Sequence, residues 1–248
     1  MEEYIIKAEN LTREFIVGEE KVQALRGISF NIKKGEFVAV MGTSGSGKST
    51  LLNLLGCLDT PTKGEYYLNG ILVKDMNRNE RATLRNRKIG FVFQSYNLLP
   101  KTTALENVEL PLFYNPDFSQ KMRVERSRKA LEDVGLSDRI YHKSNQMSGG
   151  QQQRVAIARA LVNDPVIILA DEATGNLDSR TSYEILTLFQ HLHNEARTLI
   201  FVTNNREIAI FCSRKIVLRD GRIIEDSINN DIHNASKILE SLPAEVSI

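Results

Sequence analysis

Tryptophan is absent from this 248-residue sequence, and cysteine occurs only twice, at Cys57 and Cys212. Two cysteines that lie far apart in apolar surroundings do not make a disulfide framework, so this is not a small disulfide-rich secreted domain. We expect both thiols to be small buried side chains in a reducing compartment.

The sequence also lacks an excess of either charge and lacks long apolar runs. Its 32 lysines and arginines nearly balance 31 aspartates and glutamates, so no global field favours nucleic acid or anionic lipid as a partner. The longest apolar runs, such as residues 166–170, fall far short of the roughly 20 residues of a membrane-spanning helix. The opening residues MEEYIIKAEN contain no apolar signal-peptide core. We therefore expect no nucleic-acid partner and no direct membrane insertion.

The first part of the sequence has strand-like patterning followed by a glycine-rich loop. Apolar pairs and alternations in residues 4–40, with turn signals near residues 18 and 35, predict strands with antiparallel pieces. The loop that begins at Gly42 opens a helix, which we expect to continue through Leu58 because Pro61 follows it. This order of strand, loop and helix is typical of a phosphate-binding unit.

The rest of the sequence predicts a helical block inside an α/β core. Basic residues between 78 and 88 indicate a solvated helix, with a phosphate-backbone site as the less favoured alternative. Residues 104–162 have only helical periodicity, broken near Gly135 and Ser144. Strands and helices then alternate, which predicts a largely parallel sheet. The strands are expected at residues 166–170, 199–202, 215–218 and 222–225, the helices at 179–194 and 205–211, and one short helix is possible before Pro243.

The glycine-rich loop fits the pattern G-x-x-x-x-G-K-[ST] of a phosphate-binding loop. Its glycines let backbone N–H groups face inward, because a β-carbon would obstruct both the curl of the loop and the approach of phosphate oxygens. Lys48 supplies positive charge between the outer phosphates, and Ser49 offers a hydroxyl to Mg²⁺. The predicted nucleotide-binding residues are Gly42, Thr43, Ser44, Gly45, Ser46, Gly47, Lys48, Ser49 and Thr50.

Two adjacent carboxylates, Asp171 and Glu172, end the apolar run at residues 166–170. A parallel core strand would deliver them to the sheet edge at which open α/β sheets bind ligands. Asp171 is predicted to hold Mg²⁺ through its water shell, and Glu172 to polarise the attacking water. Together with the phosphate loop they complete a phosphoryl-transfer site, so a phosphate-bearing ligand with Mg²⁺ is expected.

The segment SGGQQ at residues 148–152 places a hydroxyl and two glycine amides at the start of a predicted helix, which is a second anion site. This segment resembles the signature motif of ABC transporter ATPases, and the resemblance extends over residues 3–225. It implies a P-loop NTPase core with a mostly parallel sheet, an N-terminal antiparallel β subdomain and an inserted helical subdomain. It also implies a homodimer in which Ser148, Gly149, Gly150 and Gln151 of one copy reach the ATP bound to the other.

The resemblance assigns further roles. Phe15 matches the aromatic side chain that stacks on adenine, although a lone phenylalanine on a strand edge is otherwise more often part of the core. Gln94 matches the glutamine that contacts Mg²⁺ and water, and the segment Ser95–Pro100 would face a membrane-spanning permease subunit. Asp178 matches the aspartate that communicates across the dimer.

The resemblance also implies a domain division. Residues 1–225 would form a single ATPase domain, followed by a C-terminal tail at 226–248. Within the domain, residues 1–94 and 165–225 would form the catalytic core with its β subdomain, and residues 95–164 the helical signature subdomain.

Three segments, at residues 55–62, 103–108 and 170–178, resemble the branch of this family that serves lipoprotein release, macrolide export and antimicrobial-peptide export. Members of that branch work with permease subunits that have membrane helices. The resemblance therefore implies peripheral attachment at the cytoplasmic face of the inner membrane, and a lipoprotein, lipid, peptide or drug as cargo. ABC-type ATPases of DNA repair are disfavoured, since no heptad insertion separates Lys48 from Ser148.

Three positions depart from the family pattern: Ala173 and Met147 preserve the polar atoms of the site, whereas the third, Asn204, does not. The family has Thr-His after the strand at residues 199–202, and this chain has Thr203 and Asn204. Asparagine can donate a hydrogen bond to phosphate but cannot take up a proton near pH 7. Losing one charge-assisted contact in the transition state costs on the order of a hundredfold in rate, so we expect slow hydrolysis. The alternative is a slow or non-hydrolysing regulatory subunit that senses ATP.

Overall fold

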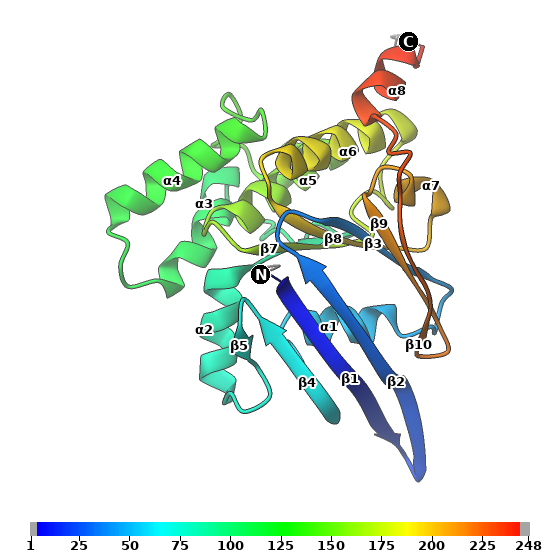
Figure 1. Ribbon diagram of the computed structural model, residues 1–248. Coiled ribbons are helices and arrows are strands. Elements are labelled where there is room, and N and C mark those ends of the chain that lie inside the picture. The colour runs from blue at the N-terminus through cyan, green and yellow to red at the C-terminus, as the bar shows by residue number, and fades with distance from the viewer. Residues whose placement is uncertain (1–3, 244–248) are drawn as a thin grey trace.

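The N-terminal strands form an antiparallel sheet, as the sequence predicts. The computed structural model describes residues 4–243, and this sheet has the order β2-β1-β4-β5 (Figure 1). Gly18, with φ +64°, makes the tight turn between its two longest strands, since glycine adopts this left-handed conformation without steric cost. Its strands are β1 (Tyr4–Val17), β2 (Glu20–Lys33), β4 (Lys63–Leu68) and β5 (Ile71–Leu72).

The second sheet is parallel except at one edge, and its order is β10-β9-β3-β8-β7-β6. Both faces of its central strands are covered, which explains their continuous apolar runs. Because parallel strands end at a common edge, the segments that follow β3, β6, β7 and β8 meet there. Its strands are β3 (Phe37–Gly42), β6 (Ile89–Phe93), β7 (Ile167–Asp171), β8 (Thr198–Thr203), β9 (Arg214–Arg219) and β10 (Arg222–Ile228).

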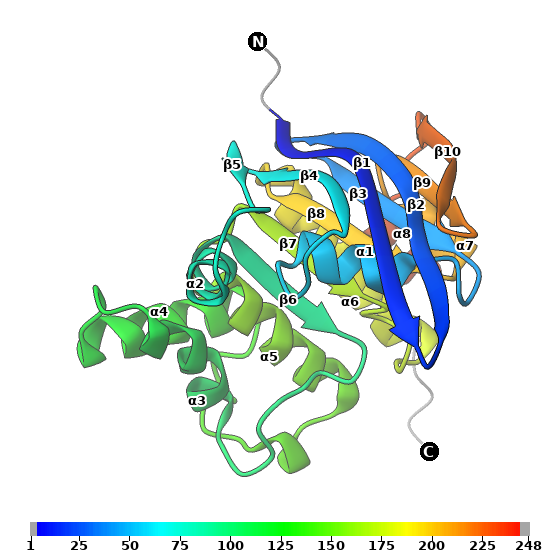
Figure 2. The same ribbon diagram turned by 90° about the horizontal axis from the view of Figure 1, so that it is seen from below.

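Helix α1 (Lys48–Leu55) lies between the two sheets, with its leucines buried in the core that they share (Figure 2). The prediction that this helix continues through Leu58 is wrong. The N–H of Gly56 donates to Leu52 O at 2.8 Å, and Cys57 turns the chain with φ +54°. The backbone therefore leaves the helix well before Pro61 can act on it.

The middle of the chain is helical and projects to one side of the core, at the left of Figure 1. In α2 the side chain of Asn77 closes a capping box with Glu80. Arg78 and Arg87 are exposed, whereas Arg85 is half-buried and donates to Cys57 O at 3.1 Å. The elements are α2 (Arg78–Lys88), α3 (Ala104–Glu109), the 3₁₀ turn η1 (Leu110–Tyr114), α4 (Gln120–Asp133), the 3₁₀ turn η2 (Ser144–Gln146) and α5 (Gly149–Leu161).

The last helices are α6 (Ser179–Asn194), α7 (Arg206–Ala209) and α8 (Ala235–Ser241). The short helix predicted before Pro243 is confirmed as α8, which packs on α6. Gln190 of α6 donates to His233 O at 2.7 Å and accepts from the N–H of Ala235 at 2.9 Å.

Strand β10 continues past its predicted end at residue 225 to Ile228. Within residues 4–243, no helix combines the length and apolarity that a bilayer span requires.

Both cysteines are buried and free, as predicted. Burial raises the pKa of Cys57 to about 11, and it raises the pKa of Cys212 further. The two thiols therefore stay protonated near neutral pH, and they serve as small apolar side chains.

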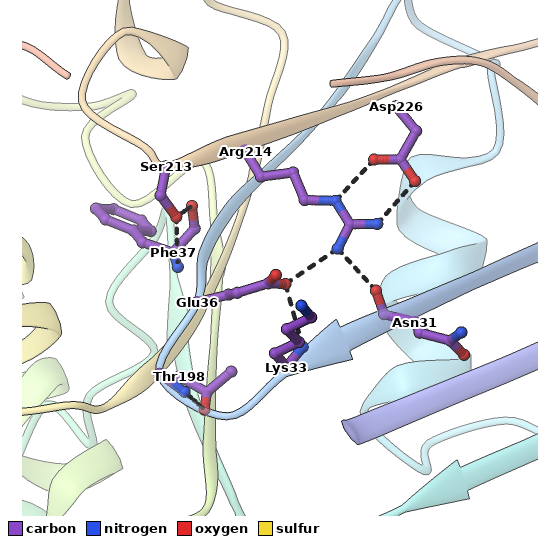
Figure 3. Close-up of polar contacts among 9 residues, drawn as sticks. Asn31, Lys33, Glu36, Phe37, Thr198, Ser213, Arg214 and Asp226 are labelled. Carbon is purple, nitrogen blue, oxygen red and sulfur yellow. Dashed lines mark hydrogen bonds and ion pairs between the residues drawn. The ribbon is translucent and has the colours of Figure 1, made fainter. Parts of the chain in front are cut away.

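A polar network around Arg214 joins the two sheets (Figure 3). Its guanidinium makes a bidentate pair with Asp226 of β10, at 2.7 and 2.8 Å. It also donates to Glu36 Oε2 at 3.0 Å and to the carbonyl of Asn31, in β2, at 2.8 Å. Because the Arg214 side chain is only 17% exposed, water screens these charge-assisted bonds less than it would at the surface.

We expect Arg214→Met to lower the free energy of unfolding by about 2 kcal/mol, because it leaves two partly buried carboxylates without their cation. Chemical denaturation measures this change. Lys215→Ala is the matched control: it removes an ion pair with Glu225 whose two side chains are 41% and 45% exposed, and it should cost about 0.5 kcal/mol or less. Equal losses for the two variants would contradict the structural role of Arg214.

Candidate functional site

The phosphate loop connects β3 to α1, as the sequence predicts. Lys48 Nζ donates to the carbonyl oxygens of Gly42 and Thr43, at 2.8 and 2.9 Å. No side chain of the described residues caps the N-terminus of α1, so its first-turn N–H groups remain available to an anion. Gly47 has φ +104°, and a β-carbon there would lie 2.7 Å from the carbonyl oxygen of Ala24. Only glycine therefore fits at this point of the loop.

A cavity of about 280 Å³ lies over this loop and is lined by six of its nine predicted residues. In the part of the chain that the structure describes, Gly42, Thr43 and Ser46 do not line it. Both carboxylates and Asn204 line it as well. Ala24 and Val202 complete the wall, and sequence reasoning did not single out either of them. The lining residues from the loop are Ser44, Gly45, Gly47, Lys48, Ser49 and Thr50.

The two carboxylates differ in environment. Burial, and then the neighbouring charge of Glu172, raise the pKa of Asp171, whereas Lys48 lowers it. Glu172 has φ +45°, a left-handed conformation that is rare for residues with a β-carbon, and its N–H donates to Val202 O at 2.9 Å. Two adjacent carboxylates beside the hydroxyl of Ser49 are oxygen donors of the kind that a hard divalent cation prefers. The donor set therefore fits Mg²⁺.

A second cavity, of about 440 Å³, meets the first at Glu172 and Asn204, which line both. Gln94 also lines it, because β6 and β7 are parallel and Phe93 is in register with Asp171. The structure thus brings Gln94, Glu172 and Asn204 to one cavity. Within the described chain, Gln94 does not line the cavity over the phosphate loop.

The signature segment forms the N-terminus of α5. Ser148 Oγ accepts from the N–H of Gln151 at 3.3 Å, and Gln151 Oε1 accepts from the N–H of Ser148 at 3.0 Å, which is a capping box. A β-carbon on Gly149 would lie 2.8 Å from the Tyr96 hydroxyl oxygen. Among the residues described, none of these four predicted signature residues lines the two cavities above. One chain alone does not unite the signature with the phosphate loop.

Asp178 caps α6, a role that the sequence reasoning did not give it. Its carboxylate accepts from the N–H of Thr181 at 2.9 Å and from the Thr181 hydroxyl at 2.6 Å. These bonds lower the pKa of Asp178. The signal was present in the sequence, because aspartate directly before a predicted helix is a preferred N-cap residue. Thr181 also lies against Gly150, where a β-carbon would come within 2.4 Å of Thr181 Cγ2.

Phe15 lies on β1 near the hairpin tip, and it is 37% exposed rather than part of the core. The Arg13 guanidinium stacks 4.6 Å from the centre of its ring. Phe15 does not line either cavity of the described chain. The exposed ring is available for stacking, as the prediction requires.

Arg159 is a positioning residue that sequence reasoning missed. From α5 it donates to the carbonyl oxygens of Asn97 and Tyr96, at 2.6 and 2.7 Å. Both of these residues have left-handed backbones, with φ values of +50° and +59°. The helix that begins with the signature therefore holds the segment that follows Gln94. A helical arginine gives no local signal for a partner that lies 62 residues away.

Comparison with known proteins decides the family. The family model described as ABC transporter matches residues 25–175, which is more than half of the chain. The chain belongs to the ABC transporter family. The resemblance seen in the sequence is thereby confirmed, and the protein is an ATP-binding and ATP-hydrolysing cassette of that family.

This ABC ATPase has close relatives among curated proteins. It is 59% identical over 207 residues to an uncharacterized ABC transporter ATP-binding protein of Thermotoga maritima, covering 84% of this chain and 88% of that one. It is 49% identical over 236 residues to the macrolide export ATP-binding/permease protein MacB of Brucella melitensis, covering 95% of this chain. It spans only 36% of that longer relative. These matches agree with the predicted branch of the family.

Solved structures confirm the fold. The ATP-binding cassette MJ0796, in a dimeric post-hydrolysis state bound to ADP and Pi, superposes with a TM-score of 0.83 at 47% identity. The superposition covers 91% of this chain and 99% of that one. MJ0796 comes from Methanocaldococcus jannaschii. The P-loop core with an antiparallel N-terminal sheet is therefore the architecture of an ABC ATPase.

Proposed function

We propose that two copies of this ABC ATPase close around two ATP molecules, and that hydrolysis drives separate permease subunits. The observation that supports the dimer is the separation of two anion sites: the phosphate loop has its own cavity, and the signature lies outside it. A second copy can bring its signature to that cavity. The dimeric structures of MJ0796 support the same arrangement.

In this proposal each residue at the sheet edge has one task. Lys48 exchanges its bonds to the loop carbonyls for contacts to the outer phosphates. Ser49, Gln94 and Asp171 would hold Mg²⁺, which would neutralise phosphate charge when bound. Glu172 accepts the proton of the attacking water. Asn204, which faces the same two cavities, donates to the γ-phosphate.

The partner copy completes the site with its signature. Because Ser148 Oγ accepts its hydrogen bond from Gln151, the hydroxyl proton of Ser148 is free to donate to a phosphate oxygen. The amides of Gly149 and Gly150 belong to the first turn of a 13-residue helix and add its positive end. Adenine stacks on Phe15. Asp178 transmits the closure of one site to the other.

We also propose that the permease docks near Ser95–Pro100. Leu99 in this segment is 44% exposed, and Asn97 lines a cavity of about 780 Å³ between α2, η1 and α5. The proposed division has a core at residues 1–94 and 165–225, a helical subdomain at 95–164 and a tail at 226–248. Residues of both the core and the helical subdomain line this cavity. Docking there would attach the dimer to the cytoplasmic face of the inner membrane. The proposed cargo is a lipoprotein, lipid, peptide or drug, and of these the relation to the macrolide export protein MacB supports the drug.

Mixing two inactive variants tests the shared site. Lys48→Ala removes the phosphate-loop charge, and Ser148→Arg blocks the signature; each should abolish hydrolysis when it is present alone. Equal mixtures should recover about a quarter of the wild-type rate, since half of the dimers are mixed and each has one intact site. Phosphate release measures this recovery. A mixture as inactive as its components would show that the site is not shared between copies.

Co-purification tests the permease. The permease encoded beside this chain should be retained by the tagged ATPase, and Leu99→Asp should release it without lowering the melting temperature. A neighbouring permease with four membrane helices and a large extracytoplasmic domain would support the proposed branch. A permease of another architecture would overturn it.

A further inference from the structure

A pair of side-chain amides joins the segment after β6 to the segment after β7. Gln94 Nε2 donates to Asn176 Oδ1 at 3.2 Å, and Asn176 Nδ2 donates to the backbone carbonyl oxygen of Gln94 at 3.1 Å. The two residues are 82 positions apart in the sequence. The segment of Asn176 therefore holds both the backbone and the side chain of Gln94.

The chain between Glu172 and Asn176 is shaped for this contact. The carbonyl of Glu172 accepts from the N–H of Gly175 at 2.8 Å, which turns the chain back towards β6. A β-carbon on Gly175 would lie 2.6 Å from Gln94 Nε2 and 3.2 Å from Gln94 Cδ. Only a residue without a side chain lets the glutamine amide lie against this turn.

The pair also determines which end of the glutamine amide is free. A backbone carbonyl can only accept a hydrogen bond, so Asn176 must present its NH₂ group to the carbonyl of Gln94. The side-chain oxygen of Asn176 then faces the Gln94 side chain, which donates to it through its own NH₂ group. Among the hydrogen bonds of residues 4–243, none uses Gln94 Oε1. The oxygen, which is the atom that Mg²⁺ prefers, is left available.

We propose that Asn176 is a positioning residue that holds the amide of Gln94 with its oxygen directed to the Mg²⁺ and the attacking water. This inference rests on the role of Gln94 in the proposed function. Asn176 lies two residues before Asp178, and Gln94 directly precedes the segment at which the permease is proposed to dock. A shift of either segment would therefore turn the Gln94 amide away from the site.

Asn176→Ala should lower kcat about three- to tenfold and raise the Mg²⁺ concentration for half-maximal activity by a similar factor, as expected for the loss of one or two solvent-accessible hydrogen bonds. The same substitution in a Gln94→Ala background should have no further effect. Asn115→Ala, at a half-buried asparagine whose side-chain oxygen accepts only from the N–H of Asp117 in its own turn, is the control and should leave the rate unchanged. Electron paramagnetic resonance measures Mn²⁺ binding to the protein in a stoichiometric complex with a non-hydrolysable ATP analogue. We expect Asn176→Ala to weaken this binding as it weakens the Mg²⁺ dependence.

The outcomes separate the two proposals. An equal loss from Asn176→Ala with and without Gln94, or no loss in either background, would overturn the positioning role alone. If Gln94→Ala itself changes neither turnover nor Mn²⁺ binding, the assignment of Gln94 fails and the positioning role fails with it. Melting temperatures that stay at the wild-type value show that the variants are folded.

Discussion

Glu172→Gln is expected to reduce steady-state ATP hydrolysis about a thousandfold while ATP binding is retained. The substitution keeps the shape of the side chain and the left-handed turn at φ +45°, but it removes the group that accepts a proton. Asp171 cannot take over this task, because in our proposal it holds Mg²⁺ from the first cavity. Phosphate release measures the loss.

The same variant should accumulate as a dimer when ATP is present, since ATP that is not hydrolysed keeps the two copies together. Size-exclusion chromatography with ATP and with ADP distinguishes this state. Glu207→Gln is the matched control, because Glu207 lines the second cavity together with Glu172. It should change the rate less than about threefold. A near-normal rate for Glu172→Gln, or a larger loss for Glu207→Gln, would place the base elsewhere.

Asn204→His is expected to raise the turnover rate, by up to about a hundredfold. Asn204 is exposed and lines both cavities beside Glu172, so the longer imidazole can reach the γ-phosphate. An imidazole can also carry a positive charge near neutral pH, which an amide cannot. Steady-state ATPase assays at saturating ATP measure the change.

Asn205→His is the control, because it places a histidine at the neighbouring position of the same turn. Asn205 lines the second cavity only, and its side chain accepts from the N–H of Glu207 at the start of α7. We expect this variant to show no gain in rate. An unchanged or lower rate for Asn204→His would mean that neighbouring groups already compensate for the missing histidine. Phosphate release from the wild-type chain that depends on Glu172 argues against a purely ATP-sensing subunit.

The predictions from sequence succeeded where the chemistry is local. The phosphate loop is one continuous segment, so the spacing of its glycines was enough to predict the curled loop that leads into α1. The limits of α6 match the predicted 179–194, because Asp178 caps its start and its apolar side chains repeat at helical spacing. By contrast, the end of α1 was misplaced, since Gly56 and the left-handed Cys57 ended the helix before any effect of the proline.

The sequence by itself determined the family and the chemical groups of the site: Lys48, Asp171, Glu172 and the signature are each recognisable within a few consecutive residues. Only the tertiary structure decided how these groups are held. It placed Glu172 and Asn204 on the wall between two cavities, and it closed the amide pair of Gln94 with Asn176. Parallel strands bring residues from distant parts of the chain to one sheet edge, and no local pattern records which of them become neighbours there.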